Sequence, residues 1–312
     1  MKKTMKTVAM AALLALVIAL LAGCGTEVDL SGINEKLDSI EASIATIQDA
    51  QAAAAAEPAA DAEPAEEPVE EAGDSAADYG EGYQFVVGFD AEFPPYGYMD
   101  DSGEYVGFDL DLAAELCDRL GWELVKQPIN WDSKDMELES GAISCIWNGF
   151  TMNGREDSYT FSVPYIDNSQ VVIVLADSGI ASFDNLAGKN VTVQADSSAL
   201  AALEENTELA DTFAALDQVA DYNTAFLNLE SGLCDAIAVD IGVAQYQLAS
   251  RGDTFVMLDE VLSTEQYAVG FKLGNTALRD IVEETMLEMY EDGVFEALAE
   301  VYDIDATMIC LG

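Results

Sequence analysis

The chain has 312 residues and a formal net charge of -47, and it contains no histidine. A surface this acidic repels nucleic acid and anionic lipid, so neither is expected as a partner. Without histidine the chain cannot build the usual serine or cysteine catalytic triad or a His-ligated metal site. We therefore expect no bound metal and no cofactor.

The N-terminus, residues 1–23, has the three-part layout of an export signal. Three lysines precede an apolar run over residues 8–22, which is short for a membrane span. The run ends in LAGC, which resembles the lipobox of bacterial lipoproteins, with Cys24 as the lipid-modified residue. An ordinary secretory signal is the plainer interpretation, but small residues directly before this cysteine favour the lipoprotein. We expect a lipid on Cys24 to hold the chain on the outer face of the bacterial cytoplasmic membrane.

Residues 24–50 contain a short pattern of apolar residues at alternating steps of three and four. Its members are Leu30, Ile33, Leu37, Ile40, Ile44 and Ile47. This spacing is typical of a coiled coil, and isoleucine at both seam positions favours a weak trimer through residues 30–47. The pattern lasts fewer than three heptads, so a single marginal helix is an equal alternative. Residues 51–80 are nearly all Ala, Glu, Asp, Pro and Gly, which predicts a disordered linker.

From residue 83 onward, short β-rich runs alternate with amphipathic helical segments. The run Phe85–Phe89 precedes a helical segment whose Leu112, Leu116 and Leu120 share one face and whose Gly121 suits a C-cap. Further strands are expected near 123–125, 143–147, 171–175, 190–194, 235–239 and 267–271. This alternation favours an α/β fold with largely parallel sheets, and the length favours two lobes. In such sheets ligands bind beyond the carboxyl ends of the strands.

Four segments of this region carry a resemblance. They are GFDAEFPPYGYMDDSGEYVGFDLDLA from Gly88, NGFTMNGRED from Asn148, QADSSA from Gln194 and CDAIAVD from Cys234. Their order and sequence resemble the extracellular solute-binding proteins, family 3, of ABC-type importers for polar amino acids. The resemblance covers residues 83–303 and implies a periplasmic-binding-protein-like fold of type II, with two α/β lobes joined by two hinge strands. Lobe 1 is expected at 83–170 and 270–312, and lobe 2 at 171–269.

The resemblance implies capture of a free polar or basic amino acid and its delivery to ABC transporter permease subunits, without catalysis. By position, Arg155 resembles the family's clamp for the α-carboxylate, and Asp240 resembles the acid that holds the α-ammonium. Such a ligand requires both charges. The plainer alternatives are a surface ion pair between Arg155 and Glu156, and Asp240 as a cap for the helix expected from Ile241.

Both lobes are expected to add contacts to the ligand. In lobe 1 the resemblance assigns hydrogen bonds to Thr151 and to the backbone around Asn148 and Gly149, which could instead form an ordinary polar turn. In lobe 2, Ser197 and Ser198 lie between an expected strand and an expected helix, where free amides suit an anion and where a simple N-cap is equally consistent.

The walls and the far end of the expected cleft also have candidates. Phe93 and Trp131 match positions where the family holds the ligand side chain between aromatic rings, although either could be core. Asp90 ends the first strand, where the family often places an acid against a polar or cationic side chain. A dehydratase-like enzyme on the same scaffold, with Glu92 or Asp90 as base, and a ligand-sensing lipoprotein are the alternatives. Which amino acid binds stays open.

Two departures from the family pattern concern the carboxylate end of the site. The segment from Thr151 to Arg155 is one residue shorter than usual, which leaves the reach of Arg155 open. Asp196 stands where Gly is common and places a negative charge beside the expected carboxylate subsite. Its direction decides whether it repels the ligand or only caps the helix.

Four cysteines remain after Cys24, at positions without the CxxC spacing of a zinc or redox site. They are Cys117, Cys145, Cys234 and Cys310. Two of them lie in apolar runs, so buried free thiols are favoured, although an exported chain could pair them.

Overall fold

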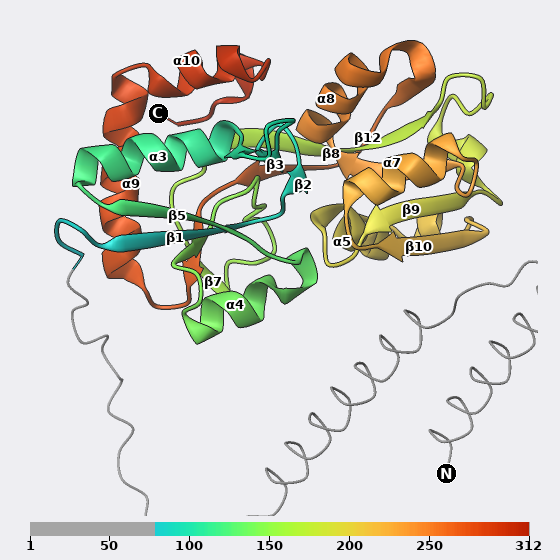
Figure 1. The fold of residues 1–312 in the computed structure, drawn as a ribbon. Helices are drawn as coiled ribbons and strands as arrows, with labels where there is room; N and C mark the ends of the chain where they lie inside the picture. The colour runs from blue at the N-terminus through green and yellow to red at the C-terminus, as the bar shows by residue number, and fades with distance from the viewer. Residues whose placement is uncertain (1–78, 312) are drawn as a thin grey trace, which may run out of the picture. The chain divides into compact units, whose positions relative to one another are not determined.

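This computed structural model describes residues 79–311. The predicted export signal, the lipid-bearing Cys24, the coil segment and the linker up to residue 78 lie outside the described residues. The described residues form two five-stranded sheets with helices on their faces (Figure 1). We call them lobe 1 and lobe 2.

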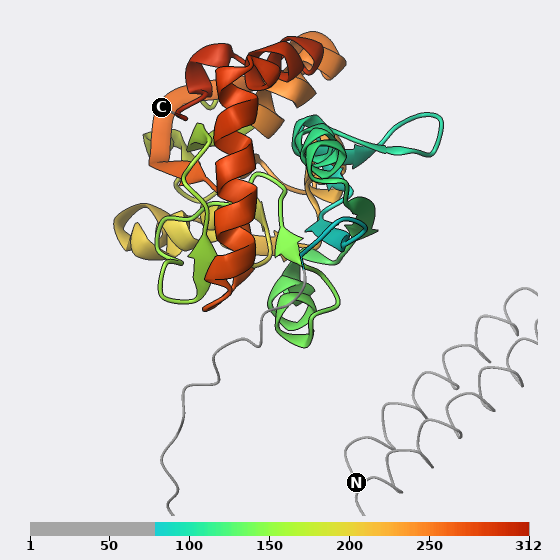
Figure 2. The same ribbon diagram turned by 90° about the vertical axis from the view of Figure 1, so that its left-hand side faces the viewer.

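Lobe 1 is built on a sheet with the strand order β5-β1-β6-β13-β7. Its strands are β1 (Gln84–Phe89), β5 (Glu123–Pro128), β6 (Cys145–Ile146), β7 (Tyr159–Phe161) and β13 (Gly270–Lys272), with the small sheet β2 (Glu92–Phe93), β3 (Gly97–Met99) and β4 (Tyr105–Val106). Its helices are α3 (Phe108–Leu120), α4 (Lys134–Ser140), α9 (Thr276–Glu291), α10 (Val294–Val301) and the 3-10 turns η2 (Trp131–Ser133) and η5 (Ala306–Met308). Helix α9, in front in Figure 2, packs against α3 and α10.

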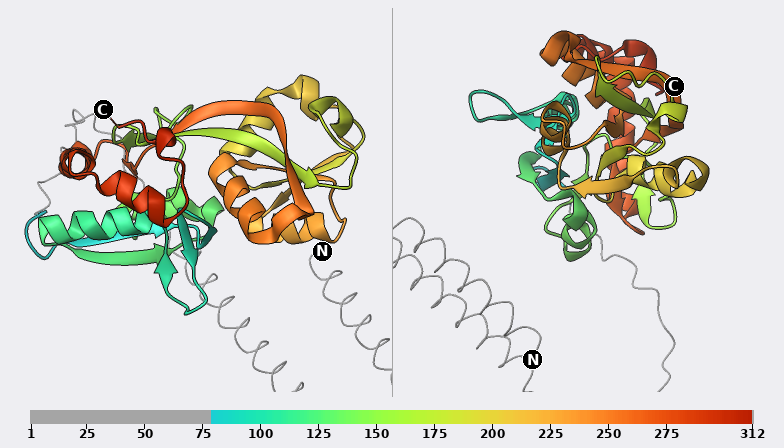
Figure 3. Two further views of the ribbon diagram at one scale, coloured as in Figure 1. Left: turned by 90° about the horizontal axis from the view of Figure 1, so that it is seen from above. Right: turned by 90° about the vertical axis from the view of Figure 1, so that its right-hand side faces the viewer.

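Lobe 2 is built on a sheet with the strand order β10-β9-β11-β8-β12. Its strands are β8 (Ile166–Leu175), β9 (Asn190–Gln194), β10 (Ala215–Val219), β11 (Ala236–Asp240) and β12 (Phe255–Tyr267). Its helices are α5 (Ser198–Glu205), α6 (Thr207–Ala210), α7 (Tyr222–Glu230), α8 (Ile241–Arg251) and the 3-10 turns η3 (Phe183–Leu186) and η4 (Gly252–Thr254). Strands β8 and β12 run side by side from one lobe to the other (Figure 3). They are the two hinge strands. The predicted lobe boundaries, between residues 170 and 171 and between residues 269 and 270, remain a prediction.

Helix α3 illustrates how the local sequence sets the fold. Its Leu112 and Leu116 are fully buried against the lobe 1 sheet, and Gly121 ends the helix at a φ of 66°. Glycine adopts this left-handed conformation without the penalty that a Cβ imposes. Acidic residues in the first turn and Arg119 in the last turn also suit the helix dipole. The predicted helix and its C-cap are confirmed.

The prediction of largely parallel sheets was wrong, because both sheets are mixed. β1 pairs in parallel with β5 and β6, and β9 with β10 and β11. The strands next to them, β13 in lobe 1 and β8 in lobe 2, pair antiparallel with their neighbours. The antiparallel pairing in lobe 2 follows from the course of the chain. Strand β8 runs out of lobe 1 and β12 runs back to it, so the two strands have opposite directions. The run expected at 267–271 is divided between the end of β12 and β13.

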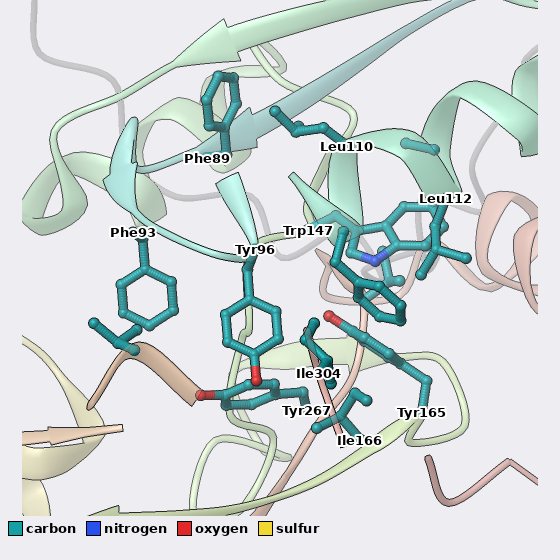
Figure 4. Close-up of a cluster of buried hydrophobic side chains, with 14 of the residues drawn as sticks. Phe89, Phe93, Tyr96, Leu110, Leu112, Trp147, Tyr165, Ile166, Tyr267 and Ile304 are labelled. Carbon is teal, nitrogen blue, oxygen red and sulfur yellow. The ribbon is translucent and has the colours of Figure 1, made fainter. Parts of the chain in front are cut away.

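The largest apolar cluster extends from lobe 1 through the hinge into lobe 2. Figure 4 shows the part of this cluster where the core of lobe 1 meets the hinge, and there Tyr96 and Tyr267 lie close together. Their ring centroids are 5.2 Å apart. The Tyr96 hydroxyl also reaches helix α8, where a Cβ on Gly242 would lie 2.2 Å from it. Only glycine permits this approach, so the two lobes are in close contact.

The four cysteines of the described residues are free thiols, and all except Cys310 are buried. Burial raises the pKa of the Cys117 thiol to about 12. Within residues 79–311, no helix combines the length and the apolar character that a membrane span needs.

Candidate functional site

Three of the predicted ligand-binding residues lie at the carboxyl ends of strands. These strand ends of lobe 1 and lobe 2 face one another. Asp90 follows β1 in lobe 1, while Ser198 follows β9 and Asp240 ends β11 in lobe 2. Side chains touch directly between the lobes, since the Gln194 Nε2 donates to the Asp90 Oδ2 at 2.6 Å and the Thr151 and Ser198 hydroxyls lie 3.0 Å apart. The carboxyl ends of strands therefore form a cleft, as expected for an α/β fold.

Asp240 is 3% exposed and is held by neutral donors from the hinge strands. Its Oδ1 accepts hydrogen bonds from the Tyr267 hydroxyl at 2.6 Å, the Gln170 Nε2 at 2.7 Å and the Asn168 Nδ2 at 2.9 Å. Asp240 occupies the N-cap position of α8, as the capping alternative expected, but its side chain makes no capping bond to the helix. Burial raises the pKa of Asp240 to about 7, and the nearby Glu265 charge adds to this effect.

Glu265, on hinge strand β12, is one of the site residues that the sequence reasoning missed. It is 7% exposed, and its Oε1 accepts a hydrogen bond from the Thr151 hydroxyl at 2.7 Å. The Asn168 Nδ2 and the Gln170 Nε2 each lie 2.8 Å from the same oxygen, and the Ser198 hydroxyl lies 3.3 Å from it. Glu265 thus joins predicted residues of both lobes in one hydrogen-bond network.

Arg155 reaches across the cleft although its turn is one residue short. Its Nη1 donates to the Thr151 carbonyl at 3.1 Å and its Nη2 to the Asp196 carbonyl of lobe 2 at 3.3 Å. The guanidinium carbon lies 5.0 Å from the centre of the Phe150 ring. Among the described residues it forms no ion pair, so the alternative of a surface pair with Glu156 was wrong.

The side chain of Asp196 does not cap the helix, and its carboxylate pairs with Lys134 of lobe 1. Lys134 is 2% exposed, and its Nζ lies 5.2 Å from the centre of the Trp131 ring. Asp196 adopts a φ of 56°, a conformation that explains why glycine suits this position. Ser197 is the N-cap of α5, accepting from the Leu200 amide. Lys134 was missed, since its position at the start of a helix resembles ordinary surface.

A hydrogen bond to the buried carboxylate of Asp109 holds the loop after β6 in place. Gly149 has a φ of 56°, and a Cβ there would lie 2.9 Å from Phe93 and 3.0 Å from Tyr267. Its amide donates to the Asp109 Oδ2 at 2.6 Å, so this amide is already engaged within the protein. Burial raises the pKa of Asp109, which is fully buried, to about 7. The Tyr165 hydroxyl donates to the second oxygen of Asp109 at 2.9 Å.

Beyond Asp90 the cleft opens into a pocket of about 310 Å³. Its walls include Trp131 and Glu92 of lobe 1 and Asp221 of lobe 2. Burial raises the pKa of Asp90 to about 6, and the charges of Asp221 and Glu92 contribute to the increase. The Asp90 amide donates to the Asn148 Oδ1 at 2.8 Å.

Phe93 does not line this pocket. It packs between Tyr96 and Tyr222, with ring centroids 5.9 and 6.0 Å away. Trp131 is therefore the predicted aromatic residue that lines the pocket, and its ring packs against that of Phe150 with the centroids 5.6 Å apart.

In chemical terms the cleft offers one guanidinium, two buried carboxylates near the hinge and an acidic pocket beside an indole ring. Residues 79–311 contain no group of three or more His, Cys, Asp or Glu side chains placed to hold a metal ion. The arrangement suits recognition of a small ligand with both charges.

Comparisons with known proteins agree with this arrangement. Residues 85–303 match the family described as bacterial extracellular solute-binding proteins, family 3. The chain is 30% identical over 218 residues to the L-cystine-binding protein TcyJ of Escherichia coli strain K12, covering 69% of this chain and 80% of that protein. It is 28% identical to a probable histidine-binding protein of Campylobacter jejuni, covering 70% of this chain and 84% of the relative.

A solved structure gives the same result. An ABC uptake transporter substrate binding protein from Streptococcus pneumoniae with bound histidine superposes with a TM-score of 0.68 at 33% identity, covering 70% of this chain and 92% of that chain.

The ion pair between Lys134 and Asp196 should stabilise contact between the lobes. We expect Lys134→Met and Asp196→Asn each to increase the radius of gyration of the ligand-free protein in small-angle X-ray scattering, because the pair links one lobe to the other. The double variant should have the same radius of gyration as each single variant, because all three lack the same ion pair. The coupling free energy between the two side chains is expected to be about 0.5–3 kcal/mol. The control is Lys272→Met, which breaks a pair with Glu139 within lobe 1. Scattering unchanged in all variants would contradict the prediction.

Proposed function

Because the chain belongs to the bacterial extracellular solute-binding proteins of family 3, we propose that it captures a polar or basic L-amino acid and delivers it to the permease subunits of an ABC transporter. Capture is binding without chemistry: both lobes contact the amino acid, and preferential affinity for the closed arrangement shifts the population toward it. The permease then receives the closed form.

The charge pattern of the cleft carries this proposal. The Arg155 guanidinium donates only to backbone carbonyls among the described residues, which leaves it without a carboxylate partner. Asp240 supplies a buried carboxylate, and Thr151 connects the two, since its carbonyl accepts from Arg155 and its hydroxyl donates to Glu265 beside Asp240. The α-carboxylate of the ligand would pair with the Arg155 guanidinium, and its α-ammonium would pair with the Asp240 carboxylate.

The pocket beyond Asp90 supports a ligand side chain that donates hydrogen bonds or carries positive charge. Three of its lining residues are acids, Asp90, Glu92 and Asp221, and Trp131 supplies an aromatic face for the aliphatic part. The names of the relatives, a cystine-binding and a probable histidine-binding protein, are consistent with such a ligand. Asp90, Trp131, Asn148 and Ser198 are accordingly proposed as contacts.

We further propose that a lipid on Cys24 anchors the protein to the outer face of the cytoplasmic membrane. Residues 51–80 would then act as a linker with a root-mean-square reach of roughly 30 Å if flexible. Such a tether keeps the capture domain near its permease. The segment 30–47 would add a weak trimer if its apolar seam pairs between chains.

A panel of the common amino acids and cystine tests the proposed ligand class. In thermal unfolding of ligand-stripped protein, we expect one or a few polar or basic amino acids to raise the midpoint, because a ligand at 100 times its Kd adds about 2.7 kcal/mol to the folded state. No shift with any member of the panel would overturn the proposal.

Removing either ligand charge partner should weaken capture strongly. We expect Arg155→Ala and Asp240→Asn each to cost about 2–5 kcal/mol of binding free energy, because each leaves a charge of the ligand buried without its partner. Isothermal titration calorimetry with the amino acid found in the panel measures this loss. Arg279→Ala, which removes a half-buried arginine of α9 that pairs with Asp280 and donates to the Phe161 carbonyl, is the matched control. Unchanged affinity in both site variants would refute the assignment.

Replacement of Cys24 tests the anchor. In bacteria that express the full chain, Cys24→Ala should release the protein from the membrane fraction and abolish incorporation of labelled palmitate, because the thiol that carries the lipid is gone. Wild-type protein that already appears free and unlabelled would indicate an ordinary secretory signal instead.

A further inference from the structure

The hinge holds two buried carboxylates against each other without a basic side chain. Asp240 and Glu265 are 3% and 7% exposed, and each accepts from the Asn168 Nδ2 and the Gln170 Nε2. None of the ion pairs formed by residues 79–311 includes either acid. Two like charges in a buried site are unfavourable unless a proton or a cation joins them.

The same cluster has more hydrogen-bond acceptors than donors. The Asn168 Oδ1 and the Gln170 Oε1 are buried and accept no hydrogen bond from the described residues. Rotating either amide would place its oxygen against the carboxylates, so the orientation with the NH2 group on the acids is the favourable one. Among the described residues, the second carboxylate oxygens, Asp240 Oδ2 and Glu265 Oε2, also accept no hydrogen bond, whereas Asp240 Oδ1 and Glu265 Oε1 accept several. An ammonium group brings three donors and a positive charge to such a site.

We infer that Glu265 is a specificity-determining residue of the cleft, which with Asp240 forms a two-carboxylate subsite for a cationic nitrogen of the ligand. The inference rests on the proposed capture of an amino acid and adds Glu265 to the groups that select it. Glu265 lies within reach of such a nitrogen, because its Oε1 is 2.7 Å from the Thr151 hydroxyl and 3.3 Å from that of Ser198. A second carboxylate at this point excludes ligands that bring an anion or a neutral hydroxyl in place of the ammonium.

A pH dependence of capture follows from the geometry. The pKa of Asp240 is raised to about 7, first by burial and then by the Glu265 charge, so below pH 7 the pair holds a proton. That proton must leave when the cation binds. Affinity is therefore highest above pH 7 and falls by about tenfold for each pH unit below it.

Other titratable groups face the pair. Tyr96, Tyr222 and Tyr267 have pKa values raised well above 10 by burial, so they stay neutral in this range. The buried acids Asp90 and Asp109 of lobe 1 have pKa values raised to about 6 and about 7, and they titrate in the same window. To assign the pH dependence of ligand affinity to the pair of Asp240 and Glu265, the experiment must change Glu265 alone.

Glu265→Gln keeps the shape and removes the charge. Calorimetric titration of the protein with L-arginine and with L-cystine at pH 5.5 and pH 7.5 compares this variant with the wild type. We expect the variant to bind about tenfold more weakly at pH 7.5 and nearly as well as the wild type at pH 5.5, because the lost repulsion lowers the pKa of Asp240. Asp259→Asn, the same charge change at an exposed position of β12, should follow the wild type at both pH values.

Three outcomes would overturn the inference. The first is a Glu265→Gln variant with wild-type affinity and a wild-type pH profile. The second is an equal loss at both pH values together with a lower unfolding midpoint, which would mean that Glu265 only supports the hinge. Absence of binding to any amino acid by the wild type would remove the proposed function itself, and this outcome is distinguished from the others because it precedes any substitution.

Discussion

The central feature of the structure is negative charge that is buried at the hinge. Only neutral hydrogen-bond donors stabilise it. Asp240 and Glu265 lie at the point where strands from both lobes converge, and only amides and hydroxyls surround them. The donors come from both hinge strands and from the cleft edge of each lobe. A change in the relative position of the lobes must therefore alter these hydrogen bonds, so the electrostatics of the cleft and the movement of the hinge are physically linked.

The basic groups at the cleft have separate tasks. Lys134 neutralises Asp196 across the cleft, while Arg155 holds the backbone carbonyl of the same residue and keeps its charge available. In a chain with a net charge of -47, few cations oppose many acids. The position of each cation consequently matters more than the total charge, because the buried Lys134 and the partly buried Arg155 each contact lobe 2 directly.

The sequence predicted the elements that depend on local pattern. The period of Leu112 and Leu116 identified α3, and strand-end positions in the recognised motifs identified Thr151, Ser198 and Asp240, which the structure brings into one network. Glu265 and Lys134 could not be found in this way. Glu265 lies on a long hinge strand where residues of both faces are polar, and only the tertiary contact with β8 shows that it faces the cleft. The antiparallel pairing of the hinge strands likewise depends on contacts between distant segments.

The unpaired cysteines have a consequence for how the closing motion can be observed. Three of the four thiols in residues 79–311 are buried, and the partly exposed Cys310 has its pKa raised to about 11 by burial. Thiolate is the reactive form, so these native thiols react slowly with maleimide dyes at neutral pH. A cysteine placed on the surface of each lobe would therefore carry the label almost alone. Fluorescence energy transfer between two such dyes could follow the distance between the lobes in real time without first removing the native cysteines.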